Sequence, residues 1–141
     1  LQAALGVSQM QRLDDFVSVR HKLAMRYDEL LEDLPIVTPY RNPRHYSAFH
    51  LYVIRLKLDL IKNTHLEIFC GLKQQGIGVN LHYIPVHMHP YYRDLGFREG
   101  NFPVAESYYH TAVSIPLFAS MSHKDQNAVV AALGLLIRDS F

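Results

Sequence analysis

The sequence predicts a small α/β (α+β) domain, in which helices cover a three- or four-stranded sheet. The chain has 141 residues, of which 49% are hydrophobic and 19% are charged, a globular composition with enough length for one core. Apolar residues recur at helical spacing in the first quarter of the chain. Short β-branched and aromatic runs then alternate with further helical patterns. We therefore expect the order helix, strand, helix, strand, helix, strand, helix.

One long helix is expected from about Gln2 to Asp33, with Pro35 ending it. Its apolar face consists of Met10, Leu13, Val17, Ala24, Tyr27, Leu31 and Leu34, which follow the 3–4 spacing of a helix. At 1.5 Å per residue this helix would be about 48 Å long, whereas a compact domain of this size has a diameter of about 37 Å. Its first turns are therefore expected to pack on another domain or subunit, the alternative being a solvated coiled-coil arm.

The chain opens with Leu1 and with residues typical of a helix interior, without an N-cap before them. We therefore interpret it as a piece of a longer protein. Residues 1–34 are expected to form an interdomain helix, and residues 35–141 a small α/β domain.

The middle of the chain predicts a connection, a strand and a capped helix. Prolines punctuate the connection at Pro35, Pro39 and Pro43. The run Ala48–Leu58 is apolar on both faces and rich in β-branched and aromatic residues, which predicts a strand in the centre of the sheet. Thr64 and Glu67 have the spacing of a capping box that opens a helix to about Gln75, and Gly76 is suited to end it.

The last third predicts two strands and two helices, with a loop between them. A short buried strand is expected over residues 79–83, and a helical turn over residues 91–95. Phe102-Pro103 starts a helix that runs to about Ala112, because proline is favoured at the first helical position. Val113–Leu117 contains Pro116 and suits an edge strand. A final helix is capped by Ser122 and Asp125, and its core face consists of Val129, Leu133, Leu136 and Ile137.

Charge and cysteine content exclude several classes of protein. The formal net charge is +1 and no basic run occurs, so we expect no nucleic-acid partner. No apolar run is long enough to span a bilayer and no signal peptide opens the sequence, so we expect no membrane partner. Cys70 is the only cysteine, which indicates a reducing, cytoplasmic setting.

Rings with polar tips are concentrated between Gly76 and Arg93, in the run GIGVNLHYIPVHMHPYYR. It holds three of the nine histidines and three of the nine tyrosines. These are His82, His87, His89, Tyr83, Tyr91 and Tyr92. Pro85 and Pro90 stiffen the loop that carries them. We interpret the loop as a site for a polar ligand; the alternatives are ordinary half-buried rings or a three-histidine metal site, whose spacing fits no familiar zinc pattern.

The chain lacks a recognisable reaction centre of its own. No glycine-rich phosphate loop precedes a helix and no serine or cysteine nucleophile motif is present. Cys70 falls within a predicted helix and is interpreted as a small buried hydrophobe. By itself the sequence therefore indicates a recognition loop without the machinery of a complete enzyme.

Four stretches together resemble the C-terminal part of the DegT/DnrJ/EryC1/StrS sugar aminotransferases. They are LQAALGVSQMQRLDDFVSVRHKLAMRYDELL, FHLYVIRL, GIGVNLHYIPVHMHPYYRDLGF and NFPVAESYYHTAVSIPLFASMSHKDQNAVVAAL. Within the family, the chain most resembles the members that aminate a nucleotide-sugar on the way to pseudaminic acid. The resemblance implies the small C-terminal domain of a fold-type-I enzyme that depends on pyridoxal phosphate, usually a homodimer.

The family carries its cofactor pocket and Schiff-base lysine in a large domain that precedes the matched region. The resemblance therefore implies that the lysines of this chain have no such role and that the fragment alone is inactive. It also implies that the loop helps to hold the nucleotide-sugar. The substrate-binding candidates are His82, Tyr83, His87, Tyr91, Tyr92 and Arg93. His89 is left out, because many relatives carry glutamine there.

The expected reaction of the parent protein is transfer of an amino group from an amino acid, glutamate, to a 4-keto nucleotide-sugar. Some relatives instead use the cofactor for dehydration, with the lysine replaced. A stand-alone α/β ligand-binding or regulatory module is the alternative from another class. It predicts a first helix without a large exposed apolar surface, whereas the fragment interpretation predicts that Ala4, Val7 and their neighbours are exposed, disordered or self-associated.

Overall fold

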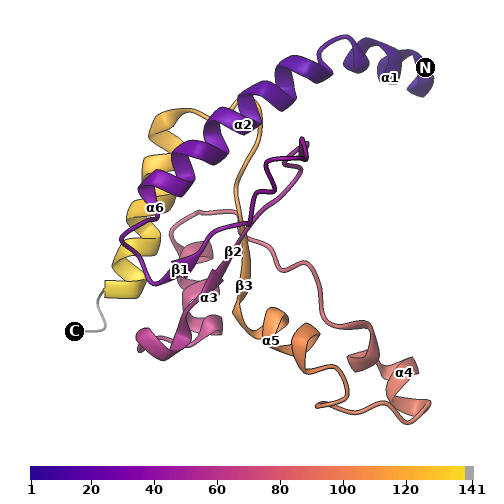
Figure 1. Ribbon diagram of the computed structural model, residues 1–141, viewed down its shortest axis with the longest axis vertical. Helices are drawn as coiled ribbons and strands as arrows, with labels where there is room; N and C mark the ends of the chain where they lie inside the picture. The colour runs from indigo at the N-terminus through magenta and orange to yellow at the C-terminus, as the bar shows by residue number, and fades with distance from the viewer. Residues whose placement is uncertain (139–141) are drawn as a thin grey trace.

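The computed structural model describes residues 1–138 and places a three-stranded antiparallel sheet among helices (Figure 1). The strands are β1 (Ile36–Val37), β2 (Tyr52–Leu56) and β3 (Ala112–Ile115). The α-helices are α1 (Gln2–Met10), α2 (Leu13–Leu30), α3 (His65–Gln74), α4 (Pro90–Asp94), α5 (Pro103–Thr111) and α6 (His123–Arg138). Two short 3-10 helices are η1 (Leu58–Leu60) and η2 (Val86–Met88). The predicted class, helices with a small sheet, is confirmed.

Strand β2 lies in the centre of the sheet, as its apolar residues on both faces predicted. It pairs with β1 through Ile36 opposite Leu56, and with β3 through Tyr52 opposite Ile115. Along β2 the buried residues Tyr52, Ile54 and Leu56 alternate with the half-buried Val53 and the exposed Arg55, whereas all four residues of β3 are buried. β3 therefore lies at one end of the strand order while its side chains still belong to the core.

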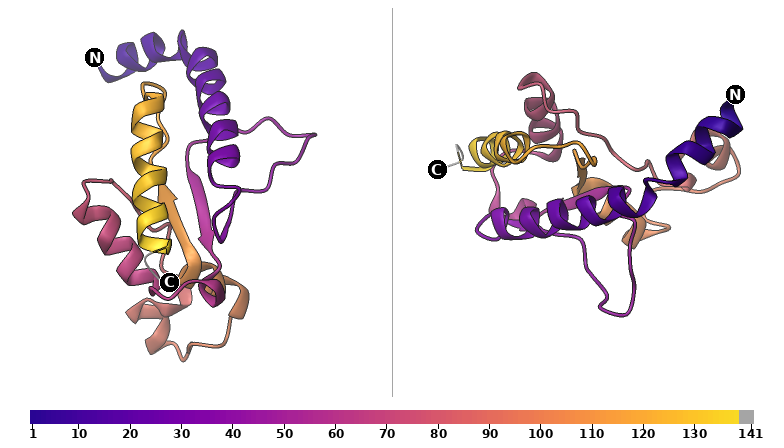
Figure 2. Two further views of the ribbon diagram at one scale, coloured as in Figure 1. Left: turned by 90° about the vertical axis from the view of Figure 1, so that its left-hand side faces the viewer. Right: turned by 90° about the horizontal axis from the view of Figure 1, so that it is seen from above.

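One core joins the sheet to helices α2, α3 and α6, which surround it in the views of Figure 2. Helix α3 packs against α6, where a Cβ on Gly71 would come within 2.5 Å of Leu136 Cδ2. The predicted core face of α6 is confirmed at Val129, Leu133 and Ile137. Close packing of this kind leaves little room for change in side-chain volume.

The periodicity predicted one continuous helix from Gln2 to Asp33, and this prediction is wrong. The helix breaks at residues 11–12 into α1 and α2, and α2 already ends at Leu30. Asp14 and Asp15 occupy the first turn of α2, where the partial positive charge of a helix N-terminus favours acidic residues. Pro35 disfavours helical backbone just before it, and turns replace the helix over residues 31–33.

Helix α1 packs on no other part of the described chain. Every residue from Leu1 to Asp15 is exposed, and α1 extends away from the body in Figure 1. The large apolar side chains among them are Leu1, Leu5, Val7, Met10 and Leu13. This agrees with the expectation that the first turns lack a partner within these residues.

Two predicted strands are shorter in the structure than in the sequence pattern. In Ala48–Leu58 only Tyr52–Leu56 is a strand, because Arg20 Nη1 donates to the carbonyls of Phe49 and His50 at 2.8 and 3.2 Å. These carbonyls are then engaged outside the ladder. The expected strand at residues 79–83 is reduced to one bridge between Asn80 and Ser114.

One strand was missed, and the other helices agree with their predictions. β1 lies in the proline-punctuated connection, where two residues are too few to show a strand period. The helical turn near residues 91–95 and the helix starting at Pro103 are confirmed as α4 and α5. Among the helices of residues 1–138, none combines the length and the apolar character that crossing a bilayer requires.

The capping box of α3 is confirmed, and its removal is a test of local stability. Thr64 Oγ1 accepts from the Glu67 amide at 3.2 Å, while a Glu67 carboxylate oxygen accepts from the Thr64 amide at 2.7 Å. Gly76 follows the helix with φ of +79°. We expect Thr64→Ala to lower the free energy of unfolding by about 1 kcal/mol, measured by urea denaturation. Ser120→Ala, at an exposed hydroxyl outside the helices, should have no effect; equal losses in both variants would contradict the cap.

Candidate functional site

The ring-rich loop leaves the sheet at Asn80 and builds a lobe, defined here as residues 85–105. The lobe contains η2, α4 and the segment that leads into α5. Figure 1 shows α4 far from the sheet, on the same side of the molecule to which α1 projects. The six predicted site residues therefore lie partly at the sheet and partly on this lobe.

His82 and Tyr83 lie at the sheet end of the loop. His82 Nδ1 is 2.8 Å from the Ser114 hydroxyl on β3, so the ring is oriented by the sheet. The Tyr83 ring meets the His82 ring edge-on with centroids 4.8 Å apart, and Tyr83 is 74% exposed. These two residues present one oriented imidazole and one free phenol.

Tyr91, Tyr92 and Arg93 lie together on α4. The two tyrosine rings are perpendicular, with centroids 5.3 Å apart, and all three side chains are exposed. Proline at the first position of α4, together with His89 O accepting from the Tyr92 and Arg93 amides at 3.0 Å, sets the start of this short helix. The structure thus brings three of the six predicted residues to one exposed helical turn.

His87 differs from the other five, because it is only 7% exposed and its polar tip is occupied. Its Nε2 lies 2.7 Å from Glu106 Oε1 on α5. The ionised carboxylate only accepts, so the ring nitrogen donates. We therefore assign His87 to holding the lobe in place, and the other predicted residues remain the candidates for contact with a ligand.

Glu106 is the central acceptor of the hydrogen bonds that hold the lobe, and it was not identified from the sequence. Its carboxylate also accepts from the Gly100 amide at 2.8 Å and the Phe102 amide at 3.1 Å. Burial raises the pKa of Glu106, but these two amides and His87 together lower it below the ordinary glutamate value. The available signal was an acid in the first turn after Phe102-Pro103, where helix N-termini favour carboxylates.

Phe97 and Phe102 were also missed, and they complete an aromatic surface on the lobe. The ring centroid of Phe102 lies 4.8 Å from that of His87 and 6.0 Å from that of Phe97. The ring centroids of Tyr92 and Phe97 are 6.4 Å apart. Aromatic residues spaced five apart follow no single helical face, so periodicity did not reveal this surface.

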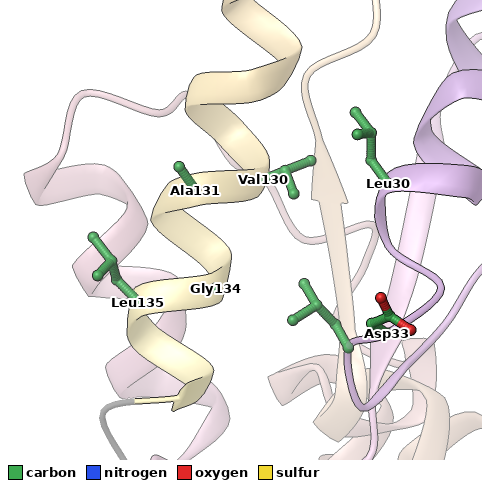
Figure 3. A pocket seen from close by; sticks show the side chains of 7 residues that line it. Leu30, Asp33, Val130, Ala131, Gly134 and Leu135 are labelled. Atoms are coloured by element: carbon green, nitrogen blue, oxygen red, sulfur yellow. The ribbon is translucent and has the colours of Figure 1, made fainter.

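A hollow of about 600 Å³ lies between the end of α2 and α6 (Figure 3). It is lined by Leu30, Asp33, Leu34, Val130, Ala131, Gly134 and Leu135. Apolar and small side chains dominate it, and it contains none of the predicted site residues. Its lining offers the Asp33 carboxylate but no histidine, cysteine, hydroxyl or cationic side chain beside it, so it is not the candidate site.

A polar cluster links the connection between β1 and β2, residues 38–51, to α2. Asp28 accepts from Arg41 and, at 2.5 Å, from the Tyr52 hydroxyl. A hollow of about 460 Å³ beside it is lined by residues of the connection and by His21. Burial, followed by Asp28, raises the pKa of Tyr52 well above its ordinary value, which leaves its hydroxyl protonated as a donor. The cluster thus has a structural role.

The alternative of a histidine metal site finds no support in the described part of the chain. No three His, Cys, Asp or Glu side chains of residues 1–138 come together in a way that could hold a metal ion. Two of the three histidines proposed as ligands are instead bonded to Ser114 and Glu106.

Comparison with known proteins gives a consistent result. The model of the DegT/DnrJ/EryC1/StrS aminotransferase family matches residues 1–134. The spore coat polysaccharide biosynthesis protein SpsC of Bacillus subtilis is 38% identical over 141 residues, which cover 98% of this chain and 36% of SpsC. The erythromycin biosynthesis sensory transduction protein EryC1 of Saccharopolyspora erythraea is 37% identical over 94% of this chain and 35% of its own. The chain thus spans about a third of the length of these relatives.

Solved structures show the same arrangement of elements. PseC of Helicobacter pylori, described as an aminotransferase involved in the biosynthesis of pseudoaminic acid, matches with a TM-score of 0.87 and 26% identity over 99% of this chain and 37% of PseC. The PLP-form of the putative sugar aminotransferase Spr1654 from Streptococcus pneumoniae matches with a TM-score of 0.87 and 24% identity over 99% of this chain and 36% of its own. The second likeness shows the fold alone.

Proposed function

The chain belongs to the DegT/DnrJ/EryC1/StrS aminotransferase family, and from this we propose that it is the C-terminal, substrate-side part of a pyridoxal-phosphate-dependent aminotransferase acting on a 4-keto nucleotide-sugar. The observation that carries the proposal is the match of the family over residues 1–134. The 38% sequence identity to SpsC, a spore coat polysaccharide biosynthesis protein, and the structural similarity to PseC support a sugar substrate.

The proposed reaction moves an amino group from an amino acid, glutamate, to the sugar in surface polysaccharide biosynthesis. The proposed product is UDP-4-amino-4,6-dideoxy-N-acetyl-β-L-altrosamine, an intermediate toward pseudaminic acid. The similarity to PseC supports this pathway.

The residues of this chain do not themselves fit the cofactor. Pyridoxal phosphate is held by a lysine amine, which supplies the chemistry of amino transfer when the cofactor is bound. All five lysines are exposed, and none lines the hollow between α2 and α6 or the hollow beside His21; they are Lys22, Lys57, Lys62, Lys73 and Lys124. The proposed cofactor site therefore belongs to a large domain upstream, and the 141 residues alone are expected to be inactive.

The role of this chain in the proposal is to bind and orient the nucleotide-sugar. Arg93 is exposed, and no carboxylate of residues 1–138 forms an ion pair with its guanidinium. It is therefore available to donate to diphosphate oxygens in pairs. His82 and Tyr83 present a ring nitrogen and a hydroxyl that suit sugar oxygens.

The experiment uses the protein as the cell makes it, in its full reading frame, with UDP-linked 4-keto sugar and glutamate. We expect an amino sugar by mass spectrometry and release of 2-oxoglutarate. Arg93→Gln should raise KM for the sugar nucleotide about ten- to a hundredfold with a smaller change in kcat, because a charged hydrogen-bond donor to the substrate is lost. Arg55→Gln, at an exposed arginine on β2, is the matched control. Dehydration of the sugar without amino transfer would show that the proposal is wrong.

A further inference from the structure

An aromatic groove of about 400 Å³ lies on the lobe. The rings of Tyr92, Phe97 and Phe102 line it, and the buried residues Pro85 and His87 lie at its base. Almost no polar atoms line this hollow, which sets it apart from the hollow beside His21 and Arg41. Its size is within the range of small-ligand pockets.

The groove is formed in advance by hydrogen bonds of the backbone around it. The Phe97 amide donates to Tyr92 O at 3.2 Å, which closes the turn between two of the rings. The Phe102 amide is held by Glu106, which also holds His87 at the base. These contacts keep the rings in place while 37 to 46% of each ring-bearing residue stays exposed.

Two arginines border the groove, each followed in the sequence by an acid, Asp94 or Glu99. Arg93 follows Tyr92 in sequence, and Arg98 follows Phe97. Arg98 Nη1 donates to the carbonyls of Arg93 and Phe97, at 2.9 Å each, so its guanidinium is fixed next to the groove. Within residues 1–138 neither arginine forms an ion pair with an acidic side chain.

A groove lined by tilted and edge-on rings, beside two guanidinium groups that form no ion pair, suits a ligand that is planar and aromatic at one end and anionic at the other. We infer that the groove binds the base of the nucleotide, with the diphosphate on Arg93 and Arg98. The inference rests on the proposed function and deepens it, because it locates the nucleotide half of the substrate. A sugar is a poorer occupant, since its hydroxyls would lie against a wall without polar partners.

This assignment separates two parts of the site. The base lies on the lobe, about the rings of Tyr92, Phe97 and Phe102, whereas the sugar extends toward His82 and Tyr83 at the sheet. The nucleotide end then contributes affinity through stacking, which tolerates different bases because every base has a π-face.

The test measures binding of UDP and of inorganic pyrophosphate by isothermal titration calorimetry, on the protein as the cell makes it. We expect Phe97→Leu, which keeps apolar bulk and removes the ring, to weaken UDP about five- to a hundredfold and to leave pyrophosphate unchanged. Tyr92→Leu should likewise weaken UDP binding and leave pyrophosphate binding unchanged, and it replaces Phe97→Leu in the test if that variant fails to fold. Phe118→Leu, at an exposed phenylalanine outside the lobe, should change neither ligand.

Unchanged UDP affinity in both folded ring variants would overturn the inference. If the groove is covered by a second copy or by the upstream domain, the ring variants should alter the mass measured by light scattering or the thermal stability, with UDP affinity unaffected, and this also overturns it. The proposed function fails separately, by the absence of amino transfer. If UDP affinity depends on Phe97 but the protein transfers no amino group, the inference about the groove stands and the proposed aminotransferase function is wrong.

Discussion

Replacement of Glu106 by alanine is expected to release the lobe from the body. The carboxylate accepts hydrogen bonds from two backbone amides and from His87, and alanine leaves all three donors without an acceptor. In hydrogen-exchange mass spectrometry, the amides of Gly100 and Phe102 should exchange about ten- to a hundredfold faster, the factor that corresponds to a buried donor without a partner. Nucleotide affinity should also fall in Glu106→Ala, because His87 at the bottom of the aromatic groove is no longer held in place.

Acid should have a similar effect on the unchanged protein. The pKa of Glu106 is lower in the folded protein than the ordinary value, so its contribution to stability is present above about pH 4.3, the ordinary glutamate pKa. It is lost as pH falls from that value through the lower pKa of the folded protein. Glu106→Gln should remove this part of the acid dependence. Glu99→Ala, at an exposed glutamate nearby, is the control for the hydrogen-exchange experiment. Faster exchange of the Gly100 and Phe102 amides in this variant as well would contradict a specific role for Glu106.

Replacement of Tyr27 by alanine is expected to have the largest effect on global stability, about 3–5 kcal/mol, the usual cost of removing a buried aromatic side chain. Tyr27 is 0% exposed on α2 and packs against Tyr52, with ring centroids 5.1 Å apart. Its hydroxyl donates to Pro116 O at 3.0 Å. One side chain thus joins α2, the central strand and the segment after β3.

A series of variants separates the ring from the hydroxyl. Tyr27→Phe should cost only about 1 kcal/mol, the net contribution of one hydrogen bond. Tyr40→Ala, at an 87% exposed tyrosine, should change the free energy of unfolding by less than about 0.5 kcal/mol. Guanidinium denaturation followed by circular dichroism measures all three. A loss in Tyr27→Phe equal to that in Tyr27→Ala would show that the hydroxyl, not the packing, is decisive.

Elements whose signals lie close together in sequence were predicted correctly. The capping box of Thr64 and Glu67 and the proline at the start of α5 depend on backbone groups within one helical turn. Gly76 depends only on its own φ of +79°. Such local preferences are present before the chain folds, so they can be recognised in the sequence.

Elements that depend on distant residues were predicted less well. The expected strand at Ala48–Leu58 begins only at Tyr52, because Arg20, almost thirty residues earlier, takes two of its carbonyls. The expected strand at residues 79–83 is limited to the bridge with Ser114. Hydrophobic pattern reports which side chains favour burial, but not which partner competes for the backbone.

The candidate site shows the same division. The ring-rich loop with its exposed Tyr91 and Tyr92 was found from composition, and Arg93 was added from the family resemblance. His87 was grouped with them, and only its distance to Glu106 showed that its ring is buried and engaged. The groove of Phe97 and Phe102 was not predicted, because its rings come together through turns and not through a periodic face.

The sequence by itself determined the class of the fold, the central strand, the caps of the helices and the region in which the candidate ligand-binding rings gather. It did so because helical spacing, capping and glycine conformation are set by residues within a few positions of each other. Only the tertiary structure decided which of those rings are free. That choice depends on Glu106, which reaches across nineteen positions to His87 and thereby fixes the lobe on which the aromatic groove forms.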